Sequence, residues 1–128
     1  MPPPRASERV TKNAGIVGRA RTSLRGLRAA WRRERSFREH LALTLVGLAA
    51  LALVGADWTE WLVAIVALAA ALGLEAMNAA FEALADKLHP ARDEAIGGAK
   101  DVASGAAFVA NCAAGAIVAA ILARNLLA

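Results

Sequence analysis

The sequence has no tyrosine, a single cysteine, and aromatic residues at only 5% of its 128 positions. Aromatic residues favour strands, whereas the alanine that is so common here favours helices, so the composition predicts an all-helical protein. The lone cysteine, Cys112, excludes an intrachain disulfide and any metal site built from paired cysteines. It lies in an apolar stretch, which indicates a packed and unreactive thiol.

Three further absences narrow the range of functions. The segment GIVGRA (15–20) lacks the lysine and hydroxyl residue of a P-loop, and GGAKD (97–101) lacks the hydroxyl residue. The catalytic-loop signature of protein kinases is missing as well. The basic N-terminus has no apolar core, so we expect no cleavable secretory signal there. The missing motifs exclude the architecture of a soluble nucleotide kinase.

The chain is instead rich in apolar residues. They make up 58% of the sequence, and the mean hydropathy is +0.45, which is high for a soluble domain. A chain of this length forms one domain, and in water it would struggle to bury so much apolar surface. Apolar runs occupy residues 41–56, 61–74 and most of 100–122. Because a bilayer is itself an apolar solvent, these runs predict membrane spans.

Charge is distributed unevenly around these runs. The formal net charge is +4, and most basic residues precede the first run: Arg5, Arg9, Lys12, Arg19, Arg21, Arg25, Arg28, Arg32, Arg33, Arg35 and Arg38. Such a block is also typical of nucleic-acid binding, but the runs that follow favour an anionic membrane surface, so we expect no nucleic-acid partner. Because basic segments stay inside, we expect a cytoplasmic N-terminus, an outward turn at 57–60 and a cytoplasmic loop at 87–98.

Together these patterns predict an all-α integral membrane protein. We expect a disordered basic tail over residues 1–12, followed by one domain over 13–126. Within that domain we expect an N-terminal amphipathic surface helix and three spans, at about 14–35, 38–56, 59–86 and 98–124.

The second span ends in a face of four polar side chains. At about 100° per residue, Glu75, Glu82 and Asp86 lie within roughly 40° of one another, and Asn78 lies beside them. Ionisable groups at membrane depth are costly, which favours a functional role. The alternative is that arginines of the surface helix neutralise these carboxylates, which then only hold the fold.

Carboxylates that share one face repel one another unless a cation joins them or a proton is shared. Mg²⁺ is one such cation, and it favours sites that combine few carboxylates with substrate phosphates. Lys100 and Asp101 lie at the same level, at the start of the third span, where a lysine can neutralise a phosphate. These groups together indicate phosphoryl transfer.

Three segments carry a resemblance to a known family: EAMNAAFEALAD (75–86), AKDVAS (99–104) and GLRAAWRRERSFR (26–38). At this spacing, in a three-span chain, they resemble the prokaryotic diacylglycerol kinase family, which includes undecaprenol kinases. The resemblance covers about residues 14–122. It implies a homotrimer whose subunits share active sites and transfer the γ-phosphate of ATP to a lipid hydroxyl, using Mg²⁺.

The resemblance also implies roles for single residues. Glu75 is expected to be the general base on the lipid hydroxyl, while Glu34 and Glu82 ligate Mg²⁺ with the phosphates of ATP. Lys100 and Asp101 are expected to contact the nucleotide. The other polar residues are expected to position these groups or the lipid headgroup: Asn78, Ser104 and Asp86.

We therefore expect a kinase of phospholipid metabolism that converts diacylglycerol to phosphatidic acid at the cytoplasmic face of the bacterial inner membrane. An undecaprenol kinase is the nearest alternative, because ERSFREH (34–40) is similar to that branch of the family. A small cation- or proton-conducting oligomer is a third reading, although a conduction pathway needs polar residues at several depths. A non-catalytic scaffold leaves the cost of Glu75 and Glu82 unexplained.

Overall fold

The computed structural model describes residues 15–89 and 93–127, and this part of the chain contains helices and no strand. In chain order the helices are α2 (Ile16–Arg33), α3 (Arg35–Leu53), α4 (Trp58–Leu88) and α5 (Glu94–Leu127). The all-helical prediction is therefore confirmed. The basic tail expected over residues 1–12 lies outside the described residues.

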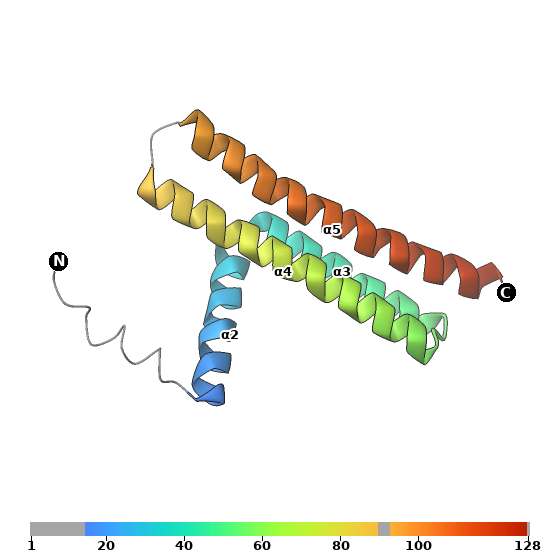
Figure 1. Ribbon diagram of the computed structural model, residues 1–128. Helices are drawn as coiled ribbons and strands as arrows, with labels where there is room; N and C mark the ends of the chain where they lie inside the picture. The colour runs from blue at the N-terminus through green and yellow to red at the C-terminus, as the bar shows by residue number, and fades with distance from the viewer. Residues whose placement is uncertain (1–14, 90–92, 128) are drawn as a thin grey trace.

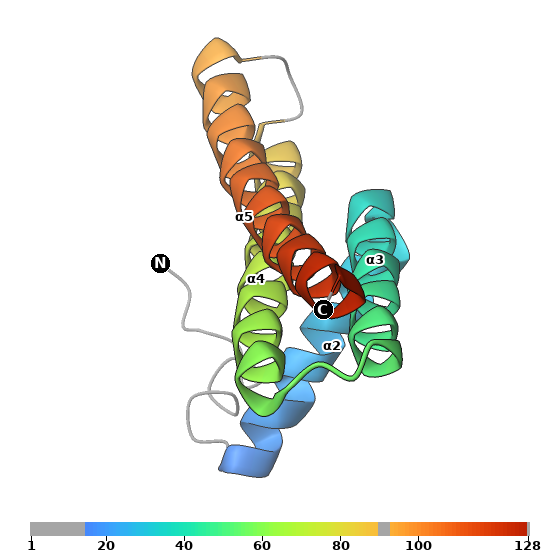
Figure 2. The same ribbon diagram turned by 90° about the vertical axis from the view of Figure 1, so that its right-hand side faces the viewer.

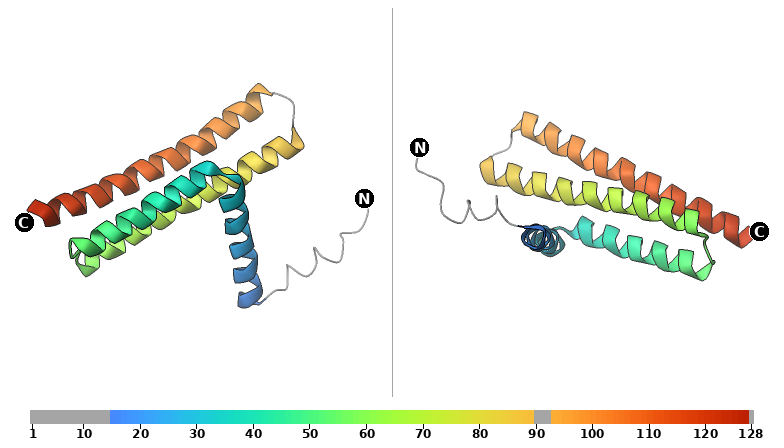
Figure 3. Two further views of the ribbon diagram at one scale, coloured as in Figure 1. Left: turned by 180° about the vertical axis from the view of Figure 1, so that it is seen from behind. Right: turned by 60° about the horizontal axis from the view of Figure 1, so that its bottom comes forward.

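Helices α3, α4 and α5 run side by side, and α2 lies across them (Figure 1). Figure 2 shows α5 against α4, with α3 to one side of this pair. In the right-hand panel of Figure 3, α2 is seen nearly end-on while the three long helices are seen from the side. Because α3 begins beside the middle of α4, the last turns of α4 and the first turns of α5 extend beyond it.

Helices α3, α4 and α5 are each long and apolar enough to cross a membrane, which confirms the three expected spans. Their outer surfaces carry large exposed apolar side chains, among them Leu45, Val66 and Phe108. Such a surface suits lipid rather than water. Helix α4 has 31 residues, so it is about 46 Å long and exceeds a hydrocarbon core of roughly 30 Å. Its polar end can therefore project beyond the apolar layer.

A sharp elbow at Glu34 separates α2 from α3. Glu34 has an extended backbone (φ −105°, ψ 119°), so one helix ends just before it and the next begins just after it. Phe37 is 5% exposed and anchors the elbow. Arg38 donates a 3.0 Å hydrogen bond to the carbonyl of Trp31, which satisfies a carbonyl in the last turn of α2. The elbow lets α2 leave the direction of the spans while its apolar side, with Leu27, faces the bundle.

The turn between α3 and α4 is held by both helix ends. Gly55 has a φ of 70°, a conformation that costs glycine little. The N–H of Ala56 bonds to the carbonyl of Leu51, as expected where a glycine ends a helix. Asp57 then caps α4, because its Oδ1 accepts hydrogen bonds from the first turn and its own N–H donates to Glu60 over 2.8 Å.

The connection between α4 and α5 is shorter than the expected loop over 87–98. The reason is Asp93, whose Oδ1 accepts a 3.0 Å hydrogen bond from the N–H of Ile96 and so starts a helix at Glu94. The glycine pair at 97–98 is helical instead of marking a loop. Because α5 starts early, Lys100 lies within this helix, beside the end of α4.

The core is a seam between α4 and α5. Buried positions on α4 recur every three or four residues: Glu60, Ala64, Leu68, Ala71, Glu75 and Ala79. The buried positions of α5 follow a similar spacing: Ala107, Ala114, Val118 and Ile121. Small residues here let the two backbones approach closely, which is the usual basis of helix packing in lipid. The same spacing brings two carboxylates, those of Glu60 and Glu75, into an apolar seam.

Candidate active site

Glu75 lies on the buried seam with only 4% of its surface exposed. Its two carboxylate oxygens face two different helices. Oε2 accepts a 3.2 Å hydrogen bond from Nδ2 of Asn111 on α5. Oε1 lies 3.3 Å from Nδ1 of His40 on α3. The carboxylate therefore sits where all three spans meet.

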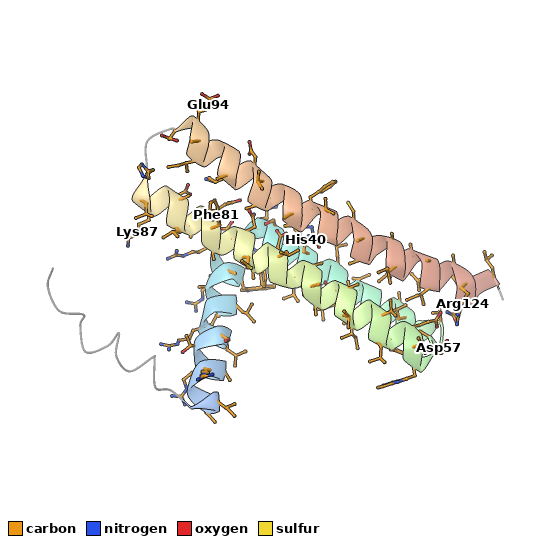
Figure 4. All side chains as sticks on the ribbon, in the orientation of Figure 1. His40, Asp57, Phe81, Lys87, Glu94 and Arg124 are labelled. Atoms are coloured by element: carbon orange, nitrogen blue, oxygen red, sulfur yellow. The ribbon has the colours of Figure 1, made fainter. Side chains whose placement is uncertain are left out.

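His40 lies near the start of α3 and points towards α4 (Figure 4). Its Nδ1 is buried and forms no hydrogen bond within the described residues, although Oε1 of Glu75 lies 3.3 Å away. His40 and Asn111 also line a mainly apolar groove of about 490 Å³ between α3 and α5. The two partners of Glu75 thus connect the carboxylate to an apolar groove.

Asn78 and Glu82 form a second polar pair further along α4. Nδ2 of Asn78 donates a 3.0 Å hydrogen bond to Oε1 of Glu82, as suits residues one turn apart. Oδ1 of Asn78 is buried and has no hydrogen-bond partner in the part of the chain that is described. The pair therefore offers an acceptor oxygen that a ligand or a water can satisfy.

Asp86 and Lys100 join the end of α4 to the start of α5. Nζ of Lys100 lies 2.8 Å from Oδ1 of Asp86, and the two side chains are 32% and 70% exposed. At this exposure water screens the two charges, so the ion pair contributes little to stability. Lys100 can therefore exchange this partner for another anion at little cost.

The three carboxylates on this face of α4 differ in exposure and in height. Glu75 is buried, Glu82 is half-buried and Asp86 is exposed. At 1.5 Å per residue, Glu82 lies about 10 Å and Asp86 about 16 Å further along the helix than Glu75. In residues 15–89 and 93–127, the arginine ion pairs involve Glu39, Asp57 and Glu60 instead. These contacts do not support the alternative in which surface-helix arginines neutralise the acidic face.

The remaining expected site residues lie apart from this group. Glu34, at the elbow, lines a groove of about 410 Å³ between α2 and α4, together with Ala76 and Ala80. Asp101 and Ser104 are exposed on α5. A single subunit therefore presents these side chains on open surface instead of gathering them around Glu75.

The acidic residues fit one kind of metal site better than another. Among the described residues, no three His, Cys, Asp or Glu side chains are grouped so that they could hold an ion. Mg²⁺ does not require such a cage, since it takes one or two carboxylates and completes its shell with phosphate oxygens and water. Glu82 is a carboxylate of this kind, and Glu34 is a second one at the elbow, so the chemistry of these residues suits Mg²⁺ whose shell phosphate oxygens would complete.

Sequence reasoning missed Asn111 and assigned no site role to His40. Asn111 is a polar residue within an otherwise apolar span, and that cost was the available signal. Its contact with Glu75 was hidden because the register between two long helices cannot be read from either helix alone. His40 was visible at the mouth of the first span, but only the elbow at Glu34 and the packing of α3 bring it to the carboxylate.

Comparison with known proteins agrees with the resemblance described above. Residues 21–122 match the family model described as prokaryotic diacylglycerol kinase. Over 107 residues the chain is 29% identical to a diacylglycerol kinase of Haemophilus influenzae. This alignment covers 84% of the chain and 91% of the relative. No solved structure gave a significant match. Because the family match spans most of its length, this chain belongs to the prokaryotic diacylglycerol kinase family.

Proposed function

We propose that this protein is an ATP-dependent kinase that phosphorylates diacylglycerol to phosphatidic acid. Family membership and the relative's name support a membrane lipid kinase of this type. The observation that carries the proposal is the buried carboxylate of Glu75, which lies beside His40 and next to an apolar groove. A base in that position can meet a hydroxyl at the polar end of a lipid.

In the proposed reaction, Glu75 removes the proton of the lipid hydroxyl while the hydroxyl oxygen attacks the γ-phosphorus of ATP. The new oxygen–phosphorus bond forms as the bond from the γ-phosphorus to the bridging oxygen breaks, so ADP leaves and the proton stays on Glu75. General-base catalysis of this kind typically contributes about 10²- to 10⁴-fold to the rate.

The nucleotide is proposed to bind at the projecting ends of α4 and α5. Bound Mg²⁺ supplies neutralisation of the charge on the β- and γ-phosphates. Glu82 and Glu34 are the residues proposed to hold it, and the hydrogen bond from Asn78 keeps the Glu82 carboxylate in place. Lys100 is proposed to exchange its weak pair with Asp86 for a phosphate.

We propose that the active enzyme is a homotrimer in the inner membrane with its N-terminus in the cytoplasm. The exposed Asp101 and Ser104 on α5 are then available to contact nucleotide and lipid headgroup across a subunit boundary. The arginines of α2 support this orientation, because basic segments stay on the cytoplasmic side.

Undecaprenol is the second candidate acceptor, and His40 is the observation that favours it. His40 ends the segment ERSFREH (34–40), which resembles undecaprenol kinases, and it contacts the proposed base Glu75. Both lipids present a hydroxyl at the membrane surface, so the chemistry at the carboxylate is the same.

A direct assay tests the proposal and separates the acceptors. The full chain is purified in detergent and incubated with Mg²⁺, ATP labelled at the γ-phosphate, and either diacylglycerol or undecaprenol. We expect label in phosphatidic acid, and none when the metal is removed with a chelator. Label only in undecaprenyl phosphate would replace the acceptor, and label in neither lipid would contradict the kinase assignment.

A further inference from the structure

Two buried glutamates of α4 each receive a hydrogen bond from an asparagine of α5. Asn111 donates to Oε2 of Glu75 over 3.2 Å and to the carbonyl of Ala107 over 2.9 Å. Near the other end of the bundle, Asn125 donates in the same way to Glu60 and to a carbonyl of its own helix. The chain therefore contains two matched asparagine–glutamate contacts, one at the candidate active site and one far from it.

The contacts of Asn111 determine the orientation of its amide. A backbone carbonyl only accepts hydrogen bonds, so the side facing Ala107 must be the NH₂ group. The same NH₂ group also donates to Glu75, so both hydrogens of the Asn111 amide are used. A flipped amide would place Oδ1 of Asn111 against two acceptor oxygens. The Asn111 amide therefore has one favourable orientation, with its NH₂ group towards Glu75.

This arrangement makes the two oxygens of Glu75 different. Oε2 is engaged by Asn111, whereas Oε1 faces Nδ1 of His40 without a hydrogen bond. We propose that Asn111 is a positioning residue that holds Oε2 of Glu75, so that Oε1 is the oxygen that takes the proton of the lipid hydroxyl. This inference rests on the proposed kinase function.

The contact between Asn125 and Glu60 is a control for the contact between Asn111 and Glu75. It shows whether an asparagine positions a carboxylate or only satisfies a buried charge. Glu60 also forms a 3.0 Å ion pair with Arg124 and accepts a 2.8 Å hydrogen bond from the N–H of Asp57. Glu75 has Asn111 as its hydrogen-bond donor within the described residues. Loss of Asn111 therefore leaves the carboxylate without this hydrogen-bond donor, whereas loss of Asn125 leaves Glu60 held by its other partners.

The test compares Asn111→Leu with Asn125→Leu in the full chain, with diacylglycerol and Mg-ATP as substrates. For Asn111→Leu we expect kcat to fall roughly 10- to 100-fold, as for a displaced catalytic group, while the KM for ATP stays within about twofold. For Asn125→Leu we expect kcat close to that of the wild type. An equal loss of kcat in both variants, or none in Asn111→Leu, overturns the inference.

A second comparison shows whether Asn111 acts through Glu75. In the background of Glu75→Gln, we expect Asn111→Leu to cause no further loss of kcat, because the group that it positions is gone. Losses that multiply in the double variant contradict the inference. The isosteric Asn111→Asp, which replaces the donor with a carboxylate, should lose at least as much kcat and serves if Asn111→Leu does not fold. An inactive wild-type protein contradicts the proposed function itself, whereas an active protein indifferent to Asn111 contradicts this inference alone.

Discussion

The two ends of the α4–α5 seam treat a buried carboxylate in different ways. At the end where α3 turns into α4, Glu60 accepts hydrogen bonds from Asn125 and from the N–H of Asp57, and it forms an ion pair with Arg124. Figure 4 shows Arg124 reaching the same corner as Asp57. At the other end, among the described residues, Glu75 has one hydrogen bond, from Asn111, and the His40 imidazole lies 3.3 Å away without forming another.

The difference separates a carboxylate with several partners from one that keeps an oxygen without a hydrogen bond, which supports the proposal that Glu75 is the base. Each hydrogen bond to a carboxylate occupies one of its lone pairs. Glu60, with its partners on α5 and in the turn, holds the start of α4 and the turn before it to the end of α5. Within residues 15–89 and 93–127, Oε1 of Glu75 has no hydrogen-bond donor, so its lone pairs remain available to a ligand.

Replacing each glutamate in turn should give the largest contrast. We expect Glu75→Gln to lower kcat by about 10²- to 10⁴-fold, because the proposed base is lost, while Mg-ATP binding is largely retained. We expect Glu60→Gln to keep kcat but to lower the free energy of unfolding by about 1–3 kcal/mol, since the amide breaks a buried network. Steady-state kinetics and denaturant unfolding in detergent measure the two effects. Similar losses of kcat in both variants would show that the ends do not differ as described.

Glu82 should be distinguishable from Glu75 by what its loss does to the nucleotide. We expect Glu82→Gln to weaken Mg-ATP binding by roughly 10- to 100-fold, the usual cost of altering a metal site. Glu39→Gln is the matched control, because Glu39 is exposed and pairs with Arg35 on its own helix. Titration with Mg-ATP measures the affinity directly. Unchanged affinity in Glu82→Gln would contradict the assignment of this carboxylate to the metal.

A smaller effect is expected at the end of α4, where Lys100 pairs with Asp86. We expect Lys100→Met to raise the KM for ATP by roughly tenfold, because one charge-assisted contact to phosphate is lost. Lys87→Met, at an exposed position of α4, should leave this KM unchanged. Asp86→Asn should leave the KM for ATP unchanged or lower it, since Lys100 no longer has a competing anion. An equal rise of the KM for ATP in Lys87→Met would show that general surface charge causes the effect, and it would contradict a specific contact between Lys100 and phosphate.

The smallest effect concerns pH and the far end of the bundle. The N–H of Glu60, followed by the Arg124 guanidinium, holds the pKa of Asp57 below its usual 3.8. A lowered pKa stabilises the folded state above the pKa of the unfolded chain, and this contribution is lost as pH falls through the folded pKa. Below about pH 4, Asp57→Asn should therefore lose less stability than the wild type on further acidification. Thermal unfolding between about pH 6 and pH 3 measures the difference, and parallel pH profiles would show that Asp57 makes no such contribution.

Much of the fold could be predicted from the sequence because the bilayer restricts the backbone to few structures. Long apolar runs must be helices, since the backbone has to satisfy its own hydrogen bonds in a bilayer. The three spans follow from that demand. Helix ends were harder, because local side chains decide them: Asp93 starts α5 before the glycine pair that was expected to end the loop. An extended backbone at Glu34 likewise ends α2 at Arg33.

Part of the candidate site could likewise be predicted from the sequence, and part of it could not. Glu75, Asn78, Glu82 and Asp86 could be grouped from the sequence, because residues three and four apart share a face of one helix. The sequence by itself determined the family, the spans and this acidic face. Only the tertiary structure decided that Glu75 turns into the seam to meet His40 and Asn111, while Asp86 reaches out to Lys100. The reason is physical: contacts between helices depend on register and on the elbow before α3, and neither is written in the periodicity of a single helix.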